Sequence, residues 1–299
     1  MDKARTDLAL EAREVWEESA ESQTELEGVW ARDIKVNGFS VSRVKILDKQ
    51  GQKMLGKPIG AYTTIELTEV SRRDAVAFSR AIETVAGELS SLIPKSQGCV
   101  LVVGLGNAGI TPDAVGTNAI NHVMVTRHLV ERMPETFGKL RKVSAIAPGV
   151  LGMTGVESGE IIRGVARHIN PDFIIVVDAL ASMKLGRLCK TVQITDTGIV
   201  PGSGVGNARA AITAETMGVP VIAMGVPTVV DIATIVASVA EESGMQIPDG
   251  ALDEYRAKLL VTPKDIDVHI SDVGRIIGYA VNTALQRGIS IEDMDMFLS

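Results

Sequence analysis

The chain has 299 residues, of which 45% are hydrophobic and 22% are charged, and its formal net charge is −7 at pH 7. This length and composition suffice for a full hydrophobic core and exclude a largely disordered chain. The acidic charge argues against a protein that binds nucleic acid through a broad basic face. Because aromatic residues make up only 3% of the chain, aliphatic residues must supply the core, as in α/β proteins with parallel sheets.

Two features of the sequence bear on the compartment in which the protein works. Cys99 and Cys189 show neither CxxC nor metal-ligand spacing, which favours a reducing compartment. No apolar run reaches the roughly 18 residues of a membrane span, and the N-terminal residues lack the apolar core of a signal peptide. We therefore expect a cytoplasmic protein that does not enter a membrane.

The first third of the chain predicts a mixture of helices and strands. Residues 1–27 hold nine acids and three bases, and apolar residues recur among them at helical spacing, which predicts an acidic amphipathic helix. Two β-rich segments follow at residues 41–47 and 61–67. The turn-rich stretch between them favours a long hairpin or a loop. A helix is expected over residues 71–92.

From residue 98 onward, short apolar runs alternate with glycine-rich turns and helical stretches. The runs are GCVLVVGLG, VSAIAP, DFIIVVDAL, TVQITDTG and VPVIAMG. Such continuous runs of Val and Ile are typical of strands buried on both faces, and their alternation with helices predicts a mostly parallel, doubly wound sheet in three layers. A long helix is expected near residues 266–287. No linker or repeat divides the chain, so we expect one α/β domain over residues 8–299.

The first candidate for chemistry lies in GLGNAGITPDAVG, residues 104–116. Its glycines match G-x-G-x-x-G, but Thr111 and Pro112 follow where a dinucleotide-binding helix should already run, which argues against a nicotinamide cofactor. A helix that begins with Thr111 as N-cap and Pro112 at its first position explains the segment better. Asp113 would then lie at the carboxyl end of a buried strand, where α/β proteins gather reacting groups. Alternatively, Asp113 only complements a helix dipole.

Asp178 is the second candidate, because it follows the apolar run FIIVV. An aspartate at the end of such a strand is costly to ionise, and perturbed carboxylates cluster at functional sites. The alternative is that Asp178 caps the next turn. Together with Asp113 it suggests one carboxylate that is kept charged and one that is kept protonated by apolar surroundings. Such a pair can activate water and donate a proton, as peptide hydrolysis without metal or covalent nucleophile requires.

The third candidate is TDTGIVPGSGVGNARAA, residues 195–211, whose backbone amides could hold an anion or a developing oxyanion. The residues placed for that auxiliary role are Gly202, Ser203 and Gly204. Asp196 follows a third predicted strand and is a further candidate for a catalytic carboxylate, after Asp113 and Asp178. The alternatives are a tight loop that matters only for shape, or a non-enzymatic α/β module that binds a small anion at residues 202–206.

Other chemistries have little support in the sequence. The four histidines fall in expected helices without HExxH spacing, so a zinc site is not predicted. No G-x-S-x-G elbow occurs, and neither cysteine lies beside a helix-opening glycine turn, so a covalent Ser or Cys mechanism is not favoured. We expect no metal and no cofactor.

Seven motifs occur in the order found in the germination proteases of spore-forming bacteria, which the chain resembles over nearly its whole length. They are RTDLALEARE, GLGN followed by TPDAVG, APGVLGMTGVES, FIIVVDALAS, TDTGIVPGSGVGNARA, GVPTVVDIATI and VTPKDID. The resemblance implies an endopeptidase that degrades small acid-soluble DNA-binding proteins of the spore core, made as a self-processing zymogen. It also implies a homotetramer and a fold like that of the hydrogenase-maturation peptidases, in the phosphorylase-like class.

The same resemblance assigns roles to particular residues. The family's two proposed catalytic aspartates lie in the TPDA and DALA motifs, which places them at Asp113 and Asp178. Family substrates are cut after an acid in sequences such as Glu-Ile/Phe-Ala-Ser-Glu, and the Asp-Leu-Ala-Leu-Glu run that begins at Asp7 is similar. The predicted processing bond therefore joins Asp7 to Leu8, and residues 1–7 form a short prosegment. By the same comparison, the chain lacks a C-terminal extension that many members have.

Overall fold

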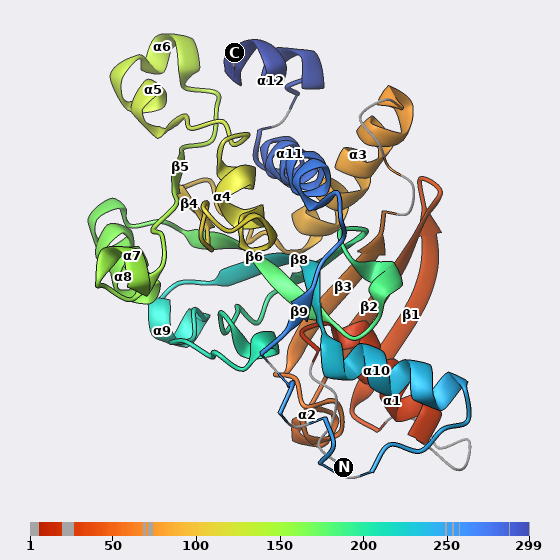
Figure 1. Cartoon of the computed structure of the whole chain (residues 1–299). Coiled ribbons are helices and arrows are strands. Elements are labelled where there is room, and N and C mark those ends of the chain that lie inside the picture. Colours follow the sequence, from red (N-terminus) through yellow and green to blue (C-terminus); the bar gives the residue numbers. More distant parts are fainter. Residues whose placement is uncertain are drawn as a thin grey trace.

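The computed structural model describes residues 6–19, 27–67, 70, 74–248, 250–252, 254–256, 258–286 and 288–298. Within these residues, nine strands form one sheet in the order β1-β2-β3-β7-β8-β6-β4-β5, with β9 paired to β8 (Figure 1). Neighbouring strands are parallel from β8 to β5 and antiparallel from β1 to β8. The expected α/β class is confirmed, although the antiparallel part of the sheet is larger than the sequence predicts.

The parallel half contains the most apolar segments of the chain. Its strands are β4 (Val100–Gly104), β5 (Val143–Ile146), β6 (Phe173–Ser182) and β8 (Val221–Asp231). Each begins close to where an apolar run begins, as predicted. However, β6 and β8 continue well past their apolar cores, so Asp178 lies inside β6 rather than at its end.

The antiparallel half departs further from expectation. Its strands are β1 (Val29–Val36), β2 (Phe39–Ile46), β3 (Gly60–Glu66) and β7 (Thr191–Thr195), and the short β9 (Leu260–Val261) lies against β8. The edge strand β1 was not predicted, because most of its side chains are exposed and carry no apolar pattern.

The segment between β2 and β3 is also a correction to the sequence-based expectation. The two strands pair antiparallel, as in the expected long hairpin, but their connection is not a simple turn or loop, because residues Lys49–Leu55 form the helix α2. Asp48 is the N-cap of this helix, and its Oδ1 accepts hydrogen bonds from the N–H groups of Gln50 and Gly51, both 2.9 Å long. This cap stabilises a short helix in a stretch that looks turn-rich.

Helices cover both faces of the sheet and complete three layers (Figure 1). One face packs against α3 (Ala75–Leu92), α4 (Val115–Ile120) and α11 (Ile266–Leu285), which share the largest apolar core. The other face packs against α8 (Ser158–Ile169) and α9 (Ala214–Met217) in the parallel half, and against α1 (Ala9–Ser19) and α2 in the antiparallel half.

Three expected helices are therefore present as α1, α3 and α11, although their predicted ends at residues 1–5, 20–26, 71–73 and 287 lie outside the described residues. The remaining helices and 3₁₀ turns are α5 (Arg127–Arg132), α6 (Pro134–Phe137), α7 (Leu151–Thr154), α10 (Ile232–Glu242), α12 (Ile291–Leu298), η1 (Thr111–Asp113), η2 (Leu185–Arg187) and η3 (Ser203–Val205). In the part of the chain that is described, no helix is long and apolar enough to span a bilayer.

Strand register sets three residues in one row across the sheet. Gly225 of β8 pairs with Asp178 of β6 on one side and with Gln193 of β7 on the other. Paired residues point to the same face, and adjacent strands lie about 4.8 Å apart. Gly225 has no side chain, and the side chain of Leu180 packs against it where a Cβ would lie.

Candidate active site

Asp178 is a buried carboxyl with little to compensate a negative charge. Its side chain lies within β6, and the residue is only 5% exposed. Oδ1 accepts one hydrogen bond of 2.9 Å, from the N–H of Ala179. Burial raises the pKa of Asp178 well above its ordinary value, and the negative charges of Asp113 and Asp7 raise it further. These surroundings favour the protonated carboxyl.

Asp113 is brought to Asp178 by the loop that follows β4. Since β6 extends beyond the end of β4, this loop crosses β6 beside Asp178, and the N–H of Leu105 donates to the Val177 carbonyl oxygen at 2.8 Å. The Asp113 Oδ2 accepts a hydrogen bond of 2.8 Å from the Asn107 N–H. Gly106 adopts a φ of +103°, and a Cβ there would collide with the Asp113 backbone. The structure thus brings together the two aspartates that the sequence singled out.

The local structure around Asp113 differs from the expected helix start. Thr111 is not an N-cap, because it lies inside the short turn η1, while Ile110 precedes that turn and provides no side-chain cap. The α-helix α4 begins only at Val115. Burial raises the pKa of Asp113, and the hydrogen bond from Asn107 opposes that rise. Neither carboxyl is therefore kept charged by a helix N-terminus, and the two differ in that Asp178 is buried more deeply and lies next to other acids.

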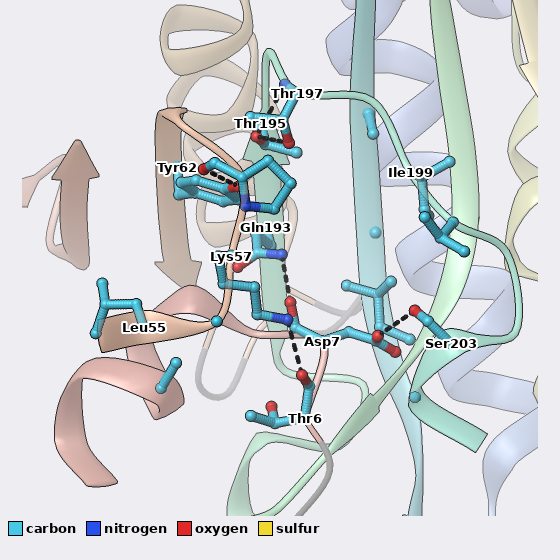
Figure 2. A pocket seen from close by; sticks show the side chains of 18 of the residues that line it. Thr6, Asp7, Leu55, Lys57, Tyr62, Gln193, Thr195, Thr197, Ile199 and Ser203 are labelled. Carbon is cyan, nitrogen blue, oxygen red and sulfur yellow. Dashed lines mark hydrogen bonds between the residues drawn. The ribbon is translucent and has the colours of Figure 1, made fainter. Parts of the chain in front are cut away.

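A groove of about 740 Å³ opens on the same face of the sheet as Asp178 (Figure 2). Its floor is formed by small residues of β8, including Ala223 and Gly225, and its walls come from the α2–β3 connection, from β7 and from the 197–204 loop. The chain's own residues Thr6 and Asp7 lie in this groove. They precede α1, whose first turn is buried.

The side chain of Asp7 is bound at one wall of the groove. Its Oδ1 accepts a hydrogen bond of 2.9 Å from the Ser203 hydroxyl (Figure 2). Its Oδ2 accepts one of the same length from the Ala181 N–H. The Asp7 N–H in turn donates to the Ala181 carbonyl at 3.1 Å. A Cβ at Gly204 would overlap the Asp7 carboxylate, so glycine is required for this fit.

The 202–206 loop thus contacts a carboxylate, but not in the manner the sequence suggested. The Ser203 hydroxyl is the donor, whereas backbone amides were expected. The carbonyl of Gly202 accepts the Asn207 N–H at 2.9 Å within the loop, and Gly202 itself has a left-handed φ of +73°. Gly202 therefore shapes the turn, while Gly204 makes room for the bound carboxylate.

The peptide bond between Asp7 and Leu8 is flanked by the side chain of Gln193 (Figure 2). Its Nε2 donates to the Asp7 carbonyl oxygen at 3.0 Å, and its Oε1 accepts the Ala9 N–H at 2.7 Å. Lys57 Nζ donates to the carbonyl oxygen of Thr6 at 2.8 Å. Sequence analysis missed both side chains, although a glutamine in the apolar run TVQIT is a buried polar group that calls for a partner.

Glu11 is fully buried in a second cluster of donors at the end of the same segment. Its carboxylate accepts hydrogen bonds from the Ser182 hydroxyl at 2.6 Å, the Met183 N–H at 2.8 Å and the Arg187 guanidinium at 3.1 Å. Arg187 also pairs with Glu14. No sequence pattern links Arg187 to Glu11, because 176 positions separate them.

Asp196 does follow a strand, as expected, but it does not join the aspartate pair. Because β7 runs antiparallel to β8, its end lies at the opposite edge of the sheet from the carboxyl ends of the parallel strands. Asp196 is exposed there, and its Oδ1 accepts the Ala61 N–H at 2.8 Å. Among the described residues, no group of three or more His, Cys, Asp and Glu side chains could hold a metal ion.

Comparisons with known proteins place this geometry in context. A family model described as germination protease matches residues 9–243. Proteins named germination protease from Caldanaerobacter subterraneus subsp. tengcongensis, Clostridium perfringens and Priestia megaterium are 44%, 43% and 36% identical to the chain. The alignments cover 98%, 100% and 98% of this chain and 98%, 100% and 96% of those proteins.

Among solved structures, the [NiFe] hydrogenase maturation protease HycI from Thermococcus kodakarensis is 16% identical, with a TM-score of 0.35. The match covers 66% of this chain and 99% of that one.

Proposed function

Because the chain belongs to the germination protease family, it is a protease of spore germination, and we propose that its substrates are small acid-soluble DNA-binding spore proteins. We propose further that it is made as a zymogen that cuts itself between Asp7 and Leu8, and that Asp113 and Asp178 perform the hydrolysis. The observation that carries this proposal is the buried Asp178 carboxyl, which lies under the influence of both Asp113 and Asp7.

The two carboxyls take different parts in the reaction. Asp178 is the deeper group, and two neighbouring acids add to the effect of burial on its pKa, so it is the carboxyl that holds a proton. Asp113 has only burial raising its pKa and one hydrogen bond opposing that rise, so it ionises first. Asp113 then acts as general base and Asp178 as general acid.

Hydrolysis proceeds by addition of water to the carbonyl carbon of the acidic residue before the cut. Asp113 removes a proton from the water as the new C–O bond forms. Asp178 donates its proton to the leaving amide nitrogen as the C–N bond breaks, and the proton taken by Asp113 returns the pair to its starting state. The products are a carboxylic acid and an amine, which become a carboxylate and an ammonium group by exchange of one proton, and no metal or covalent nucleophile takes part in this scheme.

Gln193, on β7, assists the addition of water to the carbonyl carbon. Its Nε2 hydrogen bond to the Asp7 carbonyl oxygen withdraws electron density from the carbon that water attacks. A donor of this kind stabilises the negative charge that develops on the oxygen in the transition state. Asp178 and Gln193 each pair with Gly225 in the strand register, so acid and donor lie on the same face of the sheet with β8 between them.

Incubation of the purified protein with a purified small acid-soluble spore protein tests the proposal. We expect new fragments that begin one residue after an acid, and mature enzyme that begins at Leu8 by N-terminal sequencing. Asp113→Asn should prevent both cuts, whereas Asp295→Asn, a control on α12 that pairs with Arg275, should not. Mature enzyme that begins elsewhere refutes the processing site, and an intact spore protein refutes the proposed substrate.

A further inference from the structure

Lys57 brings an ammonium group into the groove from the connection between α2 and β3. Its Nζ donates a hydrogen bond of 2.8 Å to the carbonyl oxygen of Thr6 (Figure 2). Among the described residues that line the groove, Lys57 is the only one with a positively charged side chain. The proposed proton transfers do not use this charge. Since burying an ammonium group is costly unless it is paired, its position calls for an explanation.

The charge of Lys57 is compensated by the N-terminal segment rather than by the walls of the groove. Burial lowers the pKa of Lys57, and the negative charges of Asp7 and Glu11 oppose that effect. Asp7 is the only acid among the described residues that line the groove. The ammonium group is therefore best compensated when a peptide lies in the groove, which is the behaviour of a group that binds substrate.

Lys57 and Gln193 hold the carbonyl oxygens of two successive residues. Lys57 Nζ binds that of Thr6 at 2.8 Å, and Gln193 Nε2 binds that of Asp7 at 3.0 Å. The two donors come from different segments of the chain, the α2–β3 connection and β7 (Figure 2). Holding two successive carbonyls fixes the position and the rotation of the peptide unit between them. This in turn fixes how the Asp7–Leu8 bond is presented to Gln193.

The backbone around Lys57 is constrained by contacts that do not involve the N-terminal segment. Pro58 follows Lys57 and restricts it to an extended conformation. The Tyr62 hydroxyl donates to the Pro58 carbonyl oxygen at 2.8 Å, and Asp196 Oδ1 accepts the Ala61 N–H at 2.8 Å. Asp196 thus helps to hold this connection, although it does not join the aspartate pair. The backbone that presents Lys57 is preorganised, which lowers the entropic cost of binding a peptide through it.

We propose that Lys57 is a positioning residue of this protease, which binds the carbonyl oxygen of the second residue before the cut bond. In the chain itself that residue is Thr6, and in a spore protein it is the residue that precedes the acid. Lys57 touches none of the reacting atoms, and it acts by aligning the peptide with Gln193 and Asp178. This inference rests on the proposed function, because it takes the Asp7–Leu8 bond as the bond that is cut.

The positioning role determines which kinetic constant depends on Lys57. A hydrogen bond to a carbonyl that does not react is made in the bound substrate and in the transition state alike, so its loss should raise KM and leave kcat nearly unchanged. Loss of the Gln193 donor should instead lower kcat, because negative charge develops on the oxygen that it contacts. Self-processing should be slowed less than cleavage of a separate protein, because α1 tethers the segment beside the groove.

Steady-state kinetics of the self-processed enzyme with a purified small acid-soluble spore protein test the proposal. Lys57→Gln should raise KM about 10- to 100-fold, the size expected for a lost hydrogen bond from a charged donor. Lys57→Arg keeps a positively charged donor, and its KM should fall between those of wild type and Lys57→Gln. Lys53→Gln is the control, because Lys53 is exposed in the last turn of α2, and it should have the KM of wild type.

The outcomes separate failure of this inference from failure of the proposed function. An unchanged KM in Lys57→Gln overturns the inference, and so does a loss confined to kcat or a KM that Lys57→Arg does not improve. If wild type cuts its own chain but not the spore protein, the proposed substrate fails, and a peptide of residues 1–18 takes its place in the same measurement. If wild type cuts neither, the proposed function itself fails.

Tyr62→Phe gives a second measurement, which decides alone if Lys57→Gln does not fold. It removes the hydroxyl that holds the Pro58 carbonyl oxygen, while the aromatic ring and the charge of Lys57 remain. The backbone that presents Lys57 is then less constrained, so KM should rise about threefold or more with kcat retained. A wild-type KM in Tyr62→Phe would mean that this connection does not position the substrate.

Discussion

Glu11 and Asp178 are both buried carboxyls beside one groove, yet their surroundings differ in the number of donors. Glu11 receives hydrogen bonds from three side chains, those of Thr6, Ser182 and Arg187, and from two backbone N–H groups. Asp178 receives one, from the next residue in the chain, and faces the charges of Asp113 and Asp7. The first environment stabilises a carboxylate, and the second favours the protonated acid.

In the proposed scheme, this difference assigns binding to Glu11 and proton transfer to Asp178. A carboxylate that is surrounded by donors is held in place, which suits recognition. A buried carboxyl without such compensation is costly to ionise, and perturbed carboxyls of this kind cluster at functional sites. Removing the two groups should therefore change stability in opposite directions.

The largest effect is expected for Asp178→Asn. Loss of the general acid should lower kcat about 100- to 10,000-fold, while the fold is retained because Asn has almost the same volume. The free energy of unfolding should rise at neutral pH, since a poorly compensated buried carboxyl is replaced by a neutral amide. Steady-state kinetics and urea denaturation measure the two effects. An active variant, or one less stable than wild type, would contradict the comparison.

Glu11→Ala should change stability in the other direction. Removing the carboxylate leaves Arg187 and the surrounding N–H groups with fewer partners, and breaking a buried ion pair typically costs about 3–5 kcal/mol. The change is best measured in an Asp178→Asn background, where self-processing cannot remove the N-terminal residues. Glu17→Ala is the matched control, because its pair with Arg13 is half-exposed and should contribute about 0.3–0.5 kcal/mol. Equal effects of the two substitutions would show that the Arg187 cluster does not anchor the segment.

Gln193→Met removes the donor to the Asp7 carbonyl oxygen, at the bond proposed to be cut, while keeping the length of the side chain. Loss of one such donor lowers kcat about 100- to 1,000-fold in other hydrolases, and we expect a similar loss here with a smaller change in KM. Gln52→Met, on α2, is the control and should behave as wild type. A change in KM alone would assign Gln193 to binding rather than to the reaction.

The sequence predicted one member of this comparison and missed the other. Asp178 was identified because an acid within a continuous apolar run is unusual whatever the fold. Glu11 was noticed only as part of the segment predicted to be cut, and Arg187 was not noticed at all. Their pairing depends on how distant segments meet, which hydrophobic periodicity does not encode.

Strand direction explains another part of the difference. Apolar runs located β4, β6, β7 and β8, but a short buried strand has the same pattern whether it runs parallel or antiparallel to its neighbours. The reversal of β7 moves Asp196 to the far edge of the sheet and brings Gln193 into register with Gly225. The position of Asp196 was therefore predicted wrongly, and Gln193 was overlooked, for the same reason: the direction of β7 could not be inferred from its sequence.

A smaller effect is expected in the pH dependence of the free energy of unfolding, which should report the raised pKa of Asp178. Because the pKa of Asp178 is raised in the folded protein, the folded state binds more protons than the unfolded state between the ordinary aspartate pKa and the raised one. The contribution of Asp178 to stability therefore falls as pH rises through that window. The stability of Asp178→Asn relative to wild type should grow with pH over the same range. Urea denaturation at several pH values checks this, and a difference that does not change with pH would mean that the pKa of Asp178 is not raised.

The smallest effect is expected for treatments directed at groups other than carboxyls. Cys99 and Cys189 are buried, and burial raises the pKa of both thiols, that of Cys189 to about 12. The reactive thiolate is therefore scarce near neutral pH, and alkylation under native conditions should leave cleavage unchanged.

Dialysis against a chelator should also leave cleavage unchanged, because both proton transfers in the proposed scheme are made by Asp113 and Asp178. Activity that is lost with chelator and restored by one divalent ion would replace the pair of acids with a carboxylate-bound metal. In that case Asp178, which accepts a single hydrogen bond, would act as a metal ligand rather than as a general acid.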